Sequence, residues 1–548
     1  MKMQEKNLKH RKYKIGPLPL IDQVLEKLDF SGLCHGFVKS RRYTGALEVL
    51  IKNVLMGSVA LYRIQDWASE YEPERVFGGS VGDDLLGRAL EKLFFADRAS
   101  LLTKITLKSF EAFKIDASTI HNDSTTIKFY GAYKHQSPKA VKLKRGHSKD
   151  HRPDLKQLVY NISVTEDGTV PVHFKCHDGN KTDDTLHIET WLTLRGILGR
   201  SDFLYVADSK LCTARNMSKI DCEGGKFITI VPETRLETKT FAQACYESEV
   251  RWIPLTRRAS TRHHGKYDVF QVAEGFHQLA EGFRVFWYRS SEKKIRDEEN
   301  RQERIETSLE RLDDLGTERR RGPRTKKSLL NAAARILSRY KTDHWINVEV
   351  RIQEKEDFKK TTSGKPGPDA TYRRKVRRVP YLVITKNHEA IARAQVKDGI
   401  FPLTTNSGLA AKETLQAYKY QPYLEKRFSW IKSDYDVSPV FLKKTNRIEA
   451  LMFVFYIADL VAAIIQRELR KAMQDKKLKS LETLPEQRSS ETPTWEQLQR
   501  LFAHHAKYVL THEGDIVKTF YDNLTPVQKQ VLELLNVSAT QYCGPVPA

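Results

Sequence analysis

The strongest constraint on the fold of this chain is a series of strand-like segments that begins near residue 115. The first segment is rich in β-branched residues, and the turn residues EDG join the next two. A helix-like segment with Thr182 as its expected N-cap then precedes two short apolar strands. In chain order the segments read IDASTIHNDSTTIKFYG, LVYNISVT, TVPVHFKCH, TDDTLHIETWLTLRGIL, FLYVADS and KFITIVPET. Strands followed by a helix and by further buried strands predict a mixed α/β sheet.

The remainder of the chain differs from this series. Apolar residues at three- and four-residue spacing predict helices before it, and again over 411–432 and 446–475. In between, a highly charged helical stretch separates the strand candidates VRWIPL, KYDVFQVAE, FRVFWYRS, HWINVEVRI and YLVIT. We therefore expect a helical N-terminal region (1–110), the first part of an α/β core (111–232), a β-rich insertion with a basic helical excursion (233–395), the second part of the core (396–475) and a helical C-terminal tail (476–548).

The charge of the chain favours a polyanionic partner. Its 548 residues include 92 lysines and arginines against 69 acidic residues, a formal net charge of +23. Nucleic acid is the first candidate for such a partner, and a basic but unrelated protein is the alternative. The segments densest in cations, which we expect to follow DNA phosphates, are KLKRGHSKDHR (142–152), ERRRGPRTKK (318–327) and YRRKVRR (372–378).

Cysteine use and hydrophobicity predict a cytoplasmic protein. The six cysteines are scattered and form no CxxC pair, which argues against a zinc ribbon and fits a reducing compartment. The N-terminus lacks the apolar core of a signal peptide. The most apolar stretch, from Ala450 to Ile465, is short for a membrane span and contains Asp459, so we expect a buried helix and no membrane.

Two aspartates occupy positions that this sheet would bring together. Asp123 lies within a predicted strand, at a position where an apolar residue is usual, and Asp208 ends an apolar strand. Ligands bind at strand ends of α/β sheets, and two neighbouring carboxylates repel each other unless a cation such as Mg²⁺ lies between them. The alternatives are a hydrogen-bonded strand residue and an ordinary turn residue, and Asp116 is a rival for the first position.

A third carboxylate lies in a helical stretch. Steps of three and four residues put five side chains on one predicted helical face: Tyr418, Gln421, Glu425, Phe428 and Lys432. A carboxylate, a phenol and an amine in a row can hold a metal ion and the phosphates beside it, whereas a solvated amphipathic face is the alternative. Pro422 is expected to begin a fresh helix here. Asp434 and Glu449 are weaker rivals to Glu425.

With these segments in view, the chain resembles transposases of the insertion-sequence 4 superfamily, in the branch named for insertion sequence 1634. The superfamily's third catalytic segment reads Tyr, two residues, Arg, three residues, Glu, six residues, Lys. Tyr418, Glu425 and Lys432 fit that spacing, and Gln421 stands where arginine is usual, which removes a cation from the expected DNA contact. The other segments that carry the resemblance are IGPLPLIDQVLEKLDF, HNDSTTIKFYG, GHSKDHRPDLKQLVY, VADSKLCTARN, FITIVPETR and VFLKKTNRIEALMFVFYIADLV.

The resemblance implies a ribonuclease-H-like core, interrupted by the β-rich insertion, with a metal triad of Asp123, Asp208 and Glu425. Two Mg²⁺ ions, for which Mn²⁺ can substitute, would be bridged by Asp123 during cleavage and strand transfer, with a DNA hairpin as intermediate. Tyr418, Gln421 and Lys432 would bind DNA. The partners implied are double-stranded terminal inverted repeats, read by the N-terminal region, and target DNA, held by a dimer.

Two functional alternatives stay open at this point. One is a catalytically inactive or repurposed DNA-binding protein, and the other is a metal-dependent nuclease of the same fold that cuts without joining. Trp287 and Trp345 in the insertion could stack on an extruded base, although core positions are the more ordinary interpretation.

Overall fold

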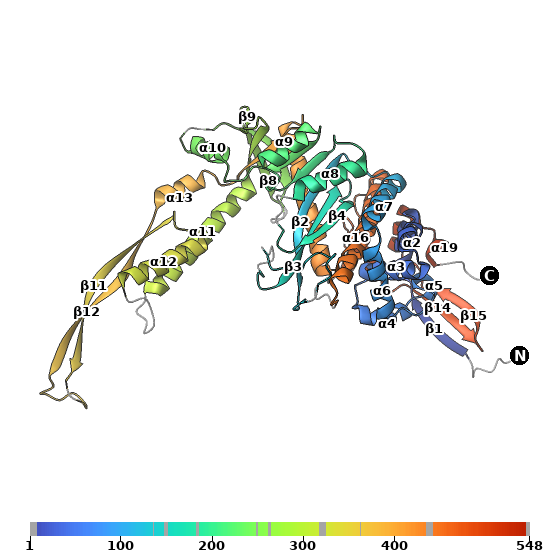
Figure 1. Ribbon diagram of the computed structural model, residues 1–548, viewed down its shortest axis with the longest axis horizontal. Coiled ribbons are helices and arrows are strands. Elements are labelled where there is room, and N and C mark those ends of the chain that lie inside the picture. Colours follow the sequence, from blue (N-terminus) through green and yellow to red (C-terminus); the bar gives the residue numbers. More distant parts are fainter. Residues whose placement is uncertain are drawn as a thin grey trace. The chain divides into compact units, whose positions relative to one another are not determined.

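The computed structural model describes residues 8–134, 136–146, 152–181, 186–247, 250–260, 265–316, 325–361, 363–434 and 442–543, without the side chains of 433 and 434. The chain forms two compact units (Figure 1). Unit 1 comprises Met1–Thr229, Thr405–Leu409 and Glu413–Ala548. Unit 2 comprises Ile230–Thr404 and Ala410–Lys412.

The predicted mixed α/β sheet is confirmed in unit 1. Its strands are β2 (Thr119–Phe129), β3 (Lys156–Thr165), β4 (Pro171–Asp178), β5 (Leu204–Ala207) and β6 (Lys226–Ile230), in the order β4-β3-β2-β5-β6. The first three pair antiparallel, whereas β2, β5 and β6 run parallel. Helix α8 (Leu186–Leu198) connects β4 to β5, and α9 (Ala214–Cys222) connects β5 to β6. The β-branched and apolar residues that predicted these strands are buried on both faces of β3.

Helices fill most of the rest of unit 1. The N-terminal ones are α1 (Leu18–Lys27), α2 (Phe30–Val38), α3 (Arg41–Leu55), α4 (Ile64–Ser69), α5 (Pro73–Val76), α6 (Asp83–Phe95) and α7 (Arg98–Phe113). The later ones are α14 (Ala411–Tyr418), α15 (Gln421–Ser429), α16 (Thr445–Asp475), α17 (Trp495–Phe502), α18 (Pro526–Leu534) and α19 (Ala539–Cys543). Except for α14, their apolar faces share one hydrophobic core with β3 and β4.

The prediction of purely helical terminal regions is wrong in one respect. Strand β1 (Leu8–Lys14) pairs antiparallel with β14 (Ala506–His512), which pairs with β15 (Asp515–Tyr521). The sequence LKHRKYK gave no strand signal because six of its seven side chains are exposed, so no face of β1 is apolar. The two ends of the chain thus meet in one small sheet.

The apolar segment in the second half of the chain is a core helix. Among the described residues, α16 is the one helix long and apolar enough to cross a membrane by length and composition. It is almost entirely buried inside unit 1 and packs on β4, where Tyr456 stacks on Phe174 with ring centroids 4.7 Å apart. The prediction of a buried helix is therefore confirmed.

Unit 2 contains the strands predicted for the insertion. Strands β13 (Ile400–Thr405), β10 (Arg284–Ser290), β8 (Tyr267–Ala273) and β7 (Trp252–Ala259) follow one another in that order, and β9 (His277–Gln278) pairs with β10. Its helices are α10 (Leu236–Glu247), α11 (Ser291–Gly316), α12 (Lys326–Tyr340) and α13 (His388–Gln395). A long antiparallel hairpin of β11 (Ile346–Lys360) and β12 (Tyr372–Lys386) completes the unit.

The two tryptophans considered for base stacking pack inside unit 2. Trp287 is 3% exposed and lies flat on Phe241, with ring centroids 3.9 Å apart. Trp345 packs against a small core built from α11, α12 and β11, and the Arg304 guanidinium lies over its ring. Both rings therefore occupy the ordinary core positions that the sequence left as the alternative.

Candidate carboxylate site

The register of two parallel strands aligns the first two candidate carboxylates. The parallel pairing of β2 with β5 places His121 opposite Val206, and Asp123 and Asp208 each lie two residues further along. Asp123 and Asp208 therefore lie side by side, just beyond the point where the pairing of β2 with β5 ends. Their charges act on the same phenol: burial first, and then Asp208 and Asp123, raise the pKa of Tyr205 well above its usual value.

Asp123 has the most solvent-exposed side chain in the middle of its strand. Every other residue from Ile120 to Ile127 is buried, whereas Asp123 is partly exposed. One of its carboxylate oxygens accepts a hydrogen bond of 2.7 Å from the Ser124 backbone N–H. The neighbouring Asn122 is buried and donates from Nδ2 to Asn161 at 2.7 Å. Alternation along the strand thus directs Asp123 to the opposite face from this buried amide pair.

Asp208 is held by a buried histidine that the sequence analysis missed. Asp208 directly follows β5, and its Oδ1 accepts a hydrogen bond from the Lys210 backbone N–H at 3.0 Å. The same oxygen lies 3.4 Å from Nε2 of His187, whose side chain is 4% exposed. Nδ1 of that imidazole lies 3.2 Å from the Tyr205 hydroxyl. The apolar stripe of α8 was the signal that could have identified His187, because a histidine on a buried helical face requires polar partners.

The prediction of one continuous helical face around Glu425 is wrong. Helix α14 ends at Tyr418, α15 begins at Gln421, and a π-helical turn follows over Trp430–Asp434. Pro422 occupies the first turn of α15, as predicted, because a proline needs no hydrogen-bond acceptor there. Glu425 is consequently exposed on a short helix of its own, while Phe428 is buried.

Buried polar contacts fix α15 against its neighbours. The Arg427 guanidinium donates to Asp459 and to Gln466 on α16, both at 3.1 Å. Asp459 is fully buried, and although Arg427 opposes the effect, burial raises its pKa to about 6. On the side of the sheet, α15 packs on β2, and the Tyr420 ring at its N-terminus lies 5.0 Å from that of His121.

Tyr418 connects the three candidate carboxylates. Burial raises the pKa of its phenol most, and the charges of Asp208, Asp123 and Glu425 raise it further. Three carboxylates from β2, from the end of β5 and from α15 are therefore near enough to act on one hydroxyl group. A pKa that is shifted by burial and by several nearby carboxylates marks a candidate functional site.

The donor set suits a hard divalent cation that takes few protein ligands. In the described part of the chain, no three His, Cys, Asp or Glu side chains are grouped closely enough to hold one metal ion. Mg²⁺, however, is commonly held by one or two carboxylates, with substrate phosphates and water completing its shell. The structure therefore does not group Asp123, Asp208 and Glu425 tightly enough to hold one ion together, whereas the partly exposed Asp123 and Asp208 suit a cation that takes only one or two carboxylates.

The structure also locates the two other residues of the expected DNA contact. The Gln421 side chain lies beside His121, and its Oε1 is buried without a hydrogen bond to any described residue. Burial lowers the pKa of His121 to about 4, and Gln421 opposes that effect. Lys432 is partly exposed in the π-helical turn, beyond the end of α15.

The rivals to the three carboxylates have structural partners. Asp116 caps the turn before β2, with its carboxylate accepting from the backbone and hydroxyl of Ser118 at 2.9 and 2.8 Å. Glu449 accepts from Arg98 at 2.7 Å and from the Val141 N–H at 2.8 Å. The side chain of Asp434 lies outside the described residues, as do 147–151 and 317–324 of the basic segments.

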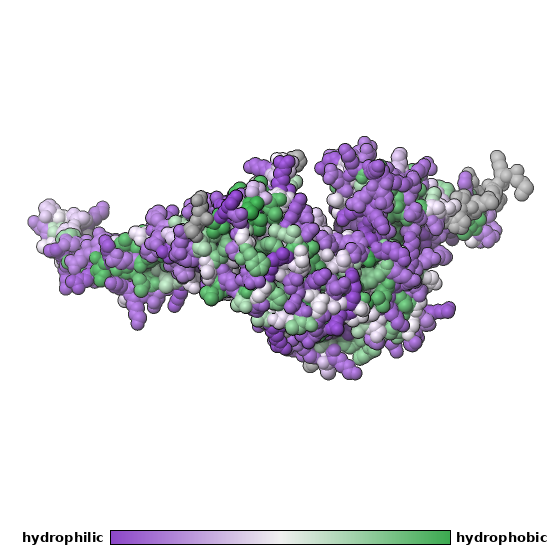
Figure 2. All heavy atoms as spheres, turned by 90° about the horizontal axis from the view of Figure 1, so that it is seen from above, coloured by the Kyte–Doolittle hydropathy of each residue, from purple (hydrophilic) through white to green (hydrophobic). Residues whose placement is uncertain are grey.

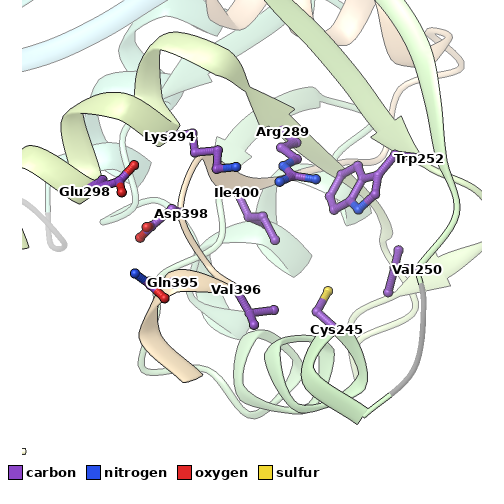
Figure 3. A pocket seen from close by; sticks show the side chains of 10 residues that line it. All are labelled: Cys245, Val250, Trp252, Arg289, Lys294, Glu298, Gln395, Val396, Asp398 and Ile400. Atoms are coloured by element: carbon purple, nitrogen blue, oxygen red, sulfur yellow. The ribbon is translucent and has the colours of Figure 1, made fainter. Parts of the chain in front are cut away.

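A separate pocket of about 520 Å³ lies inside unit 2 and contains none of these carboxylates (Figure 3). Arg289 and Lys294 extend into it, and the Arg289 guanidinium lies 5.8 Å from the centre of the Trp252 ring. Two carboxylates also line it, Glu298 and Asp398, and Asp398 accepts two 2.6 Å hydrogen bonds from Arg301. The lining therefore mixes cationic, acidic and aromatic side chains.

Comparisons with known proteins leave the family of the chain open. No protein-family model matches it, and neither does any curated protein. Among solved structures, it is similar to a piggyBac transposase in a synaptic complex with hairpin DNA. That match has a TM-score of 0.27 and 9% identity, and it covers 50% of this chain and 59% of that chain. So weak a likeness shows neither a shared fold nor a shared activity.

Proposed function

We propose that the chain is a DNA transposase that cleaves and rejoins DNA at the ends of an insertion sequence. The observation that carries the proposal is that the register of β2 and β5 brings Asp123 and Asp208 to the same level of the sheet, and that both aspartates and Glu425 raise the pKa of the half-buried Tyr418 phenol. The segments that resemble insertion-sequence 4 transposases support it, as does the net charge of +23, which suits a DNA substrate.

For unit 1 we propose a ribonuclease-H-like core. The strand order β4-β3-β2-β5-β6, with three antiparallel strands continued by two parallel ones, supports this assignment. Helices α8 and α9 form the crossovers to the parallel strands, as that fold requires. The two aspartates would then lie on the central strand and on its parallel neighbour.

In this proposal Asp123, Asp208 and Glu425 hold two Mg²⁺ ions, for which Mn²⁺ can substitute. When bound, the metal would lower the pKa of an attacking water and stabilise the leaving 3′ oxygen. The two aspartates are fixed by the sheet, and Glu425 by the buried contacts of α15 with α16. His187 would orient the Asp208 carboxylate.

The residues around the carboxylates would bind the DNA backbone. Because burial and three negative charges raise the pKa of Tyr418, its hydroxyl stays protonated and can donate a hydrogen bond to a phosphate oxygen. Lys432 would add a positive charge, and Gln421 a neutral amide where relatives have a cation. A dimer would hold the two DNA ends together, in the cytoplasm.

The test uses the purified full chain and labelled duplex DNA carrying the sequences that flank its gene. We expect Mg²⁺-dependent cleavage and strand transfer that Asp123→Asn, Asp208→Asn and Glu425→Gln each abolish, while DNA binding measured in EDTA persists. Asp116→Asn is the matched control, since it removes the same charge seven residues from Asp123 and should leave cleavage intact.

Each of the other outcomes would assign a different role to a carboxylate or a different activity to the chain. Cleavage by any of the three carboxylate variants would refute the ligand role of that residue. Cleavage without joining would identify a nuclease, and binding without cleavage by the unaltered chain would identify a DNA-binding protein that has no catalytic activity.

A further inference from the structure

The β11–β12 hairpin of unit 2 extends past the helices that support its base (Figure 1). Near the base, Ile346 and Val350 are buried against α11 and α12, and Leu382 and Ile384 pack on the same small core. From Glu354 onward on β11, and back to Arg378 on β12, nearly every side chain is exposed. We call this outer part, residues 354–360 and 372–378, the arm; seven residues per strand give it a length of about 24 Å.

The register of the arm separates its side chains by parity. Residues directly opposite in an antiparallel pair share a face, and the pairs run from Glu354 with Arg378 to Lys360 with Tyr372. Odd-numbered residues therefore lie on one face and even-numbered residues on the other. The odd face carries Lys355, Asp357, Lys359, Arg373, Lys375 and Arg377, that is, five cations and one carboxylate.

The even face has a different composition, and its two arginines form ion pairs across the strands. Arg378 pairs with Glu354 across the strands at 3.0 Å, and Arg374 pairs with Glu356. Phe358, Val376 and Tyr372 on this face are 61%, 47% and 51% exposed. The arginines of the even face are thus already paired with carboxylates of the facing strand, in exposed pairs that contribute little to stability.

Most cations of the odd face do not form such ion pairs across the strands. Arg377 pairs with Asp357. Lys359, Arg373 and Lys375 form no ion pair with a carboxylate among the residues that the structure describes, although Asp357 lies directly opposite Lys375 in the register. Hydrophilic and hydrophobic side chains are both visible along the hairpin (Figure 2). The odd face carries the larger excess of cations, because the even face has three cations against two carboxylates.

We propose that the odd face of the arm binds the phosphate backbone of duplex DNA, away from the carboxylates and without reading sequence. A two-stranded ribbon has the width that the major groove admits, and cations on one face suit a single line of phosphates. Duplex DNA is the proposed partner because the cations of the odd face complement its phosphates. The inference rests on the proposed function only in taking DNA as the substrate.

The experiment compares two doubly substituted full-length chains that lose the same charge from the same strand. Arg373→Gln with Lys375→Gln changes the odd face, and Arg374→Gln with Arg378→Gln changes the even face. Each is titrated with a fluorescent random-sequence duplex of about 30 base pairs in EDTA over a range of KCl concentrations. Thermal unfolding of each chain checks that the fold is retained.

We expect the odd-face chain to bind about tenfold more weakly, and its log–log salt slope to fall by about two, because two phosphate contacts are lost. The even-face chain should stay within about twofold of the unaltered protein. Equal losses in both chains, a loss in the even-face chain alone, or no loss in either would overturn the inference. So would a changed self-association of the odd-face chain with unchanged DNA affinity, since the arm would then bind a second copy.

The binding measurement needs neither metal nor cleavage, so it separates this inference from the proposed function. A chain that never cuts DNA can still show the difference between the two faces. In the converse case, the unaltered chain cuts and joins DNA while the two substituted chains bind DNA equally well. That result would support the proposed function and refute the inference about the arm.

Discussion

At the scale of single residues, the candidate site depends on polar groups that are buried beside it. Asp208 contacts His187, which in turn contacts the Tyr205 hydroxyl. Arg427 contacts Asp459 beneath Glu425. Partners of this kind fix the rotamer of a ligand without touching the substrate, and their loss commonly reduces metal affinity or activity by about 10- to 100-fold.

Replacing His187 with leucine should therefore raise the Mg²⁺ concentration needed for half-maximal cleavage by about 10- to 100-fold, because Asp208 loses the contact that orients it. His187→Gln, which can still donate to the carboxylate, should recover part of the loss. The measurement is cleavage rate against Mg²⁺ concentration at fixed DNA. An unchanged Mg²⁺ requirement in the leucine variant would remove His187 from the site.

Arg427→Met should make the stability of the chain more dependent on pH. The folded-state pKa of Asp459, about 6, lies above its usual 3.8, so its contribution to stability is full below pH about 4 and is lost as the pH rises through about 6. Without Arg427, burial acts unopposed and the loss extends to higher pH. We expect the free energy of unfolding to fall by about 3–5 kcal/mol at pH about 7.5 and by less at pH about 5.

Urea denaturation at the two pH values measures this difference. Arg470→Met is the control, because Arg470 donates to the Pro493 carbonyl at 3.1 and 2.9 Å rather than to a carboxylate. The Arg470→Met substitution should lower the free energy of unfolding by the same amount at both pH values. An Arg427→Met cost that does not change with pH would contradict the assigned pKa of Asp459.

At the scale of elements, the sequence predicted those strands and helices whose burial leaves a pattern. The core strands β2 to β6 and the helix α16 were predicted because β-branched and apolar residues fill them. Strand β1 and the outer halves of β11 and β12 were not predicted, because exposed and charged strands show no apolar alternation. Pro422 predicted the start of α15, but nothing in the spacing predicted the π-helical turn after it.

The same reasoning separates what could be known of the site. Asp123, Asp208 and Glu425 were identified from strand ends and from resemblance. Their shared influence on Tyr418 depends on long-range packing, which no local pattern encodes. His187 was missed because its partners are distant in sequence. Its position on the apolar face of a helix predicts burial with polar partners, but not which residues those partners are.

Removing residues 1–14 should loosen the small sheet that joins the two ends of the chain. Deleting β1 leaves β14 and β15 as a two-stranded hairpin, which is marginally stable on its own. We expect faster amide hydrogen exchange over 506–521, with exchange in β2 and β3 unchanged. A full-length chain with Lys9→Gln and Arg11→Gln keeps the strand and serves as the control. Unchanged exchange in the truncated chain would show that the hairpin does not need β1.

At the scale of the whole molecule, the excess of cations should dominate DNA binding before any chemistry occurs. The formal charge of +23 belongs to the entire chain. Among its dense basic segments, 372–378 is fully described, and it lies on the exposed arm. Affinity based on phosphate contacts depends strongly on salt and little on sequence.

We accordingly expect the affinity of the full chain for random duplex DNA to fall at least about a thousandfold between about 50 and 200 mM KCl, as for proteins with six or more phosphate contacts. Fluorescence anisotropy in EDTA measures it. A shallow salt dependence would mean that the net charge serves solubility rather than DNA.

The anchoring of α15 by α16 also has a consequence for synthesis on the ribosome. Glu425 leaves the exit tunnel before Asp459 and Gln466, so the helix that carries it lacks its contacts with α16 until those later residues emerge. A polypeptide released early would carry all three carboxylates without the helix that anchors α15 and completes the core beside β4. Under the proposed function, such a fragment could occupy DNA without breaking it, and would compete with the finished enzyme.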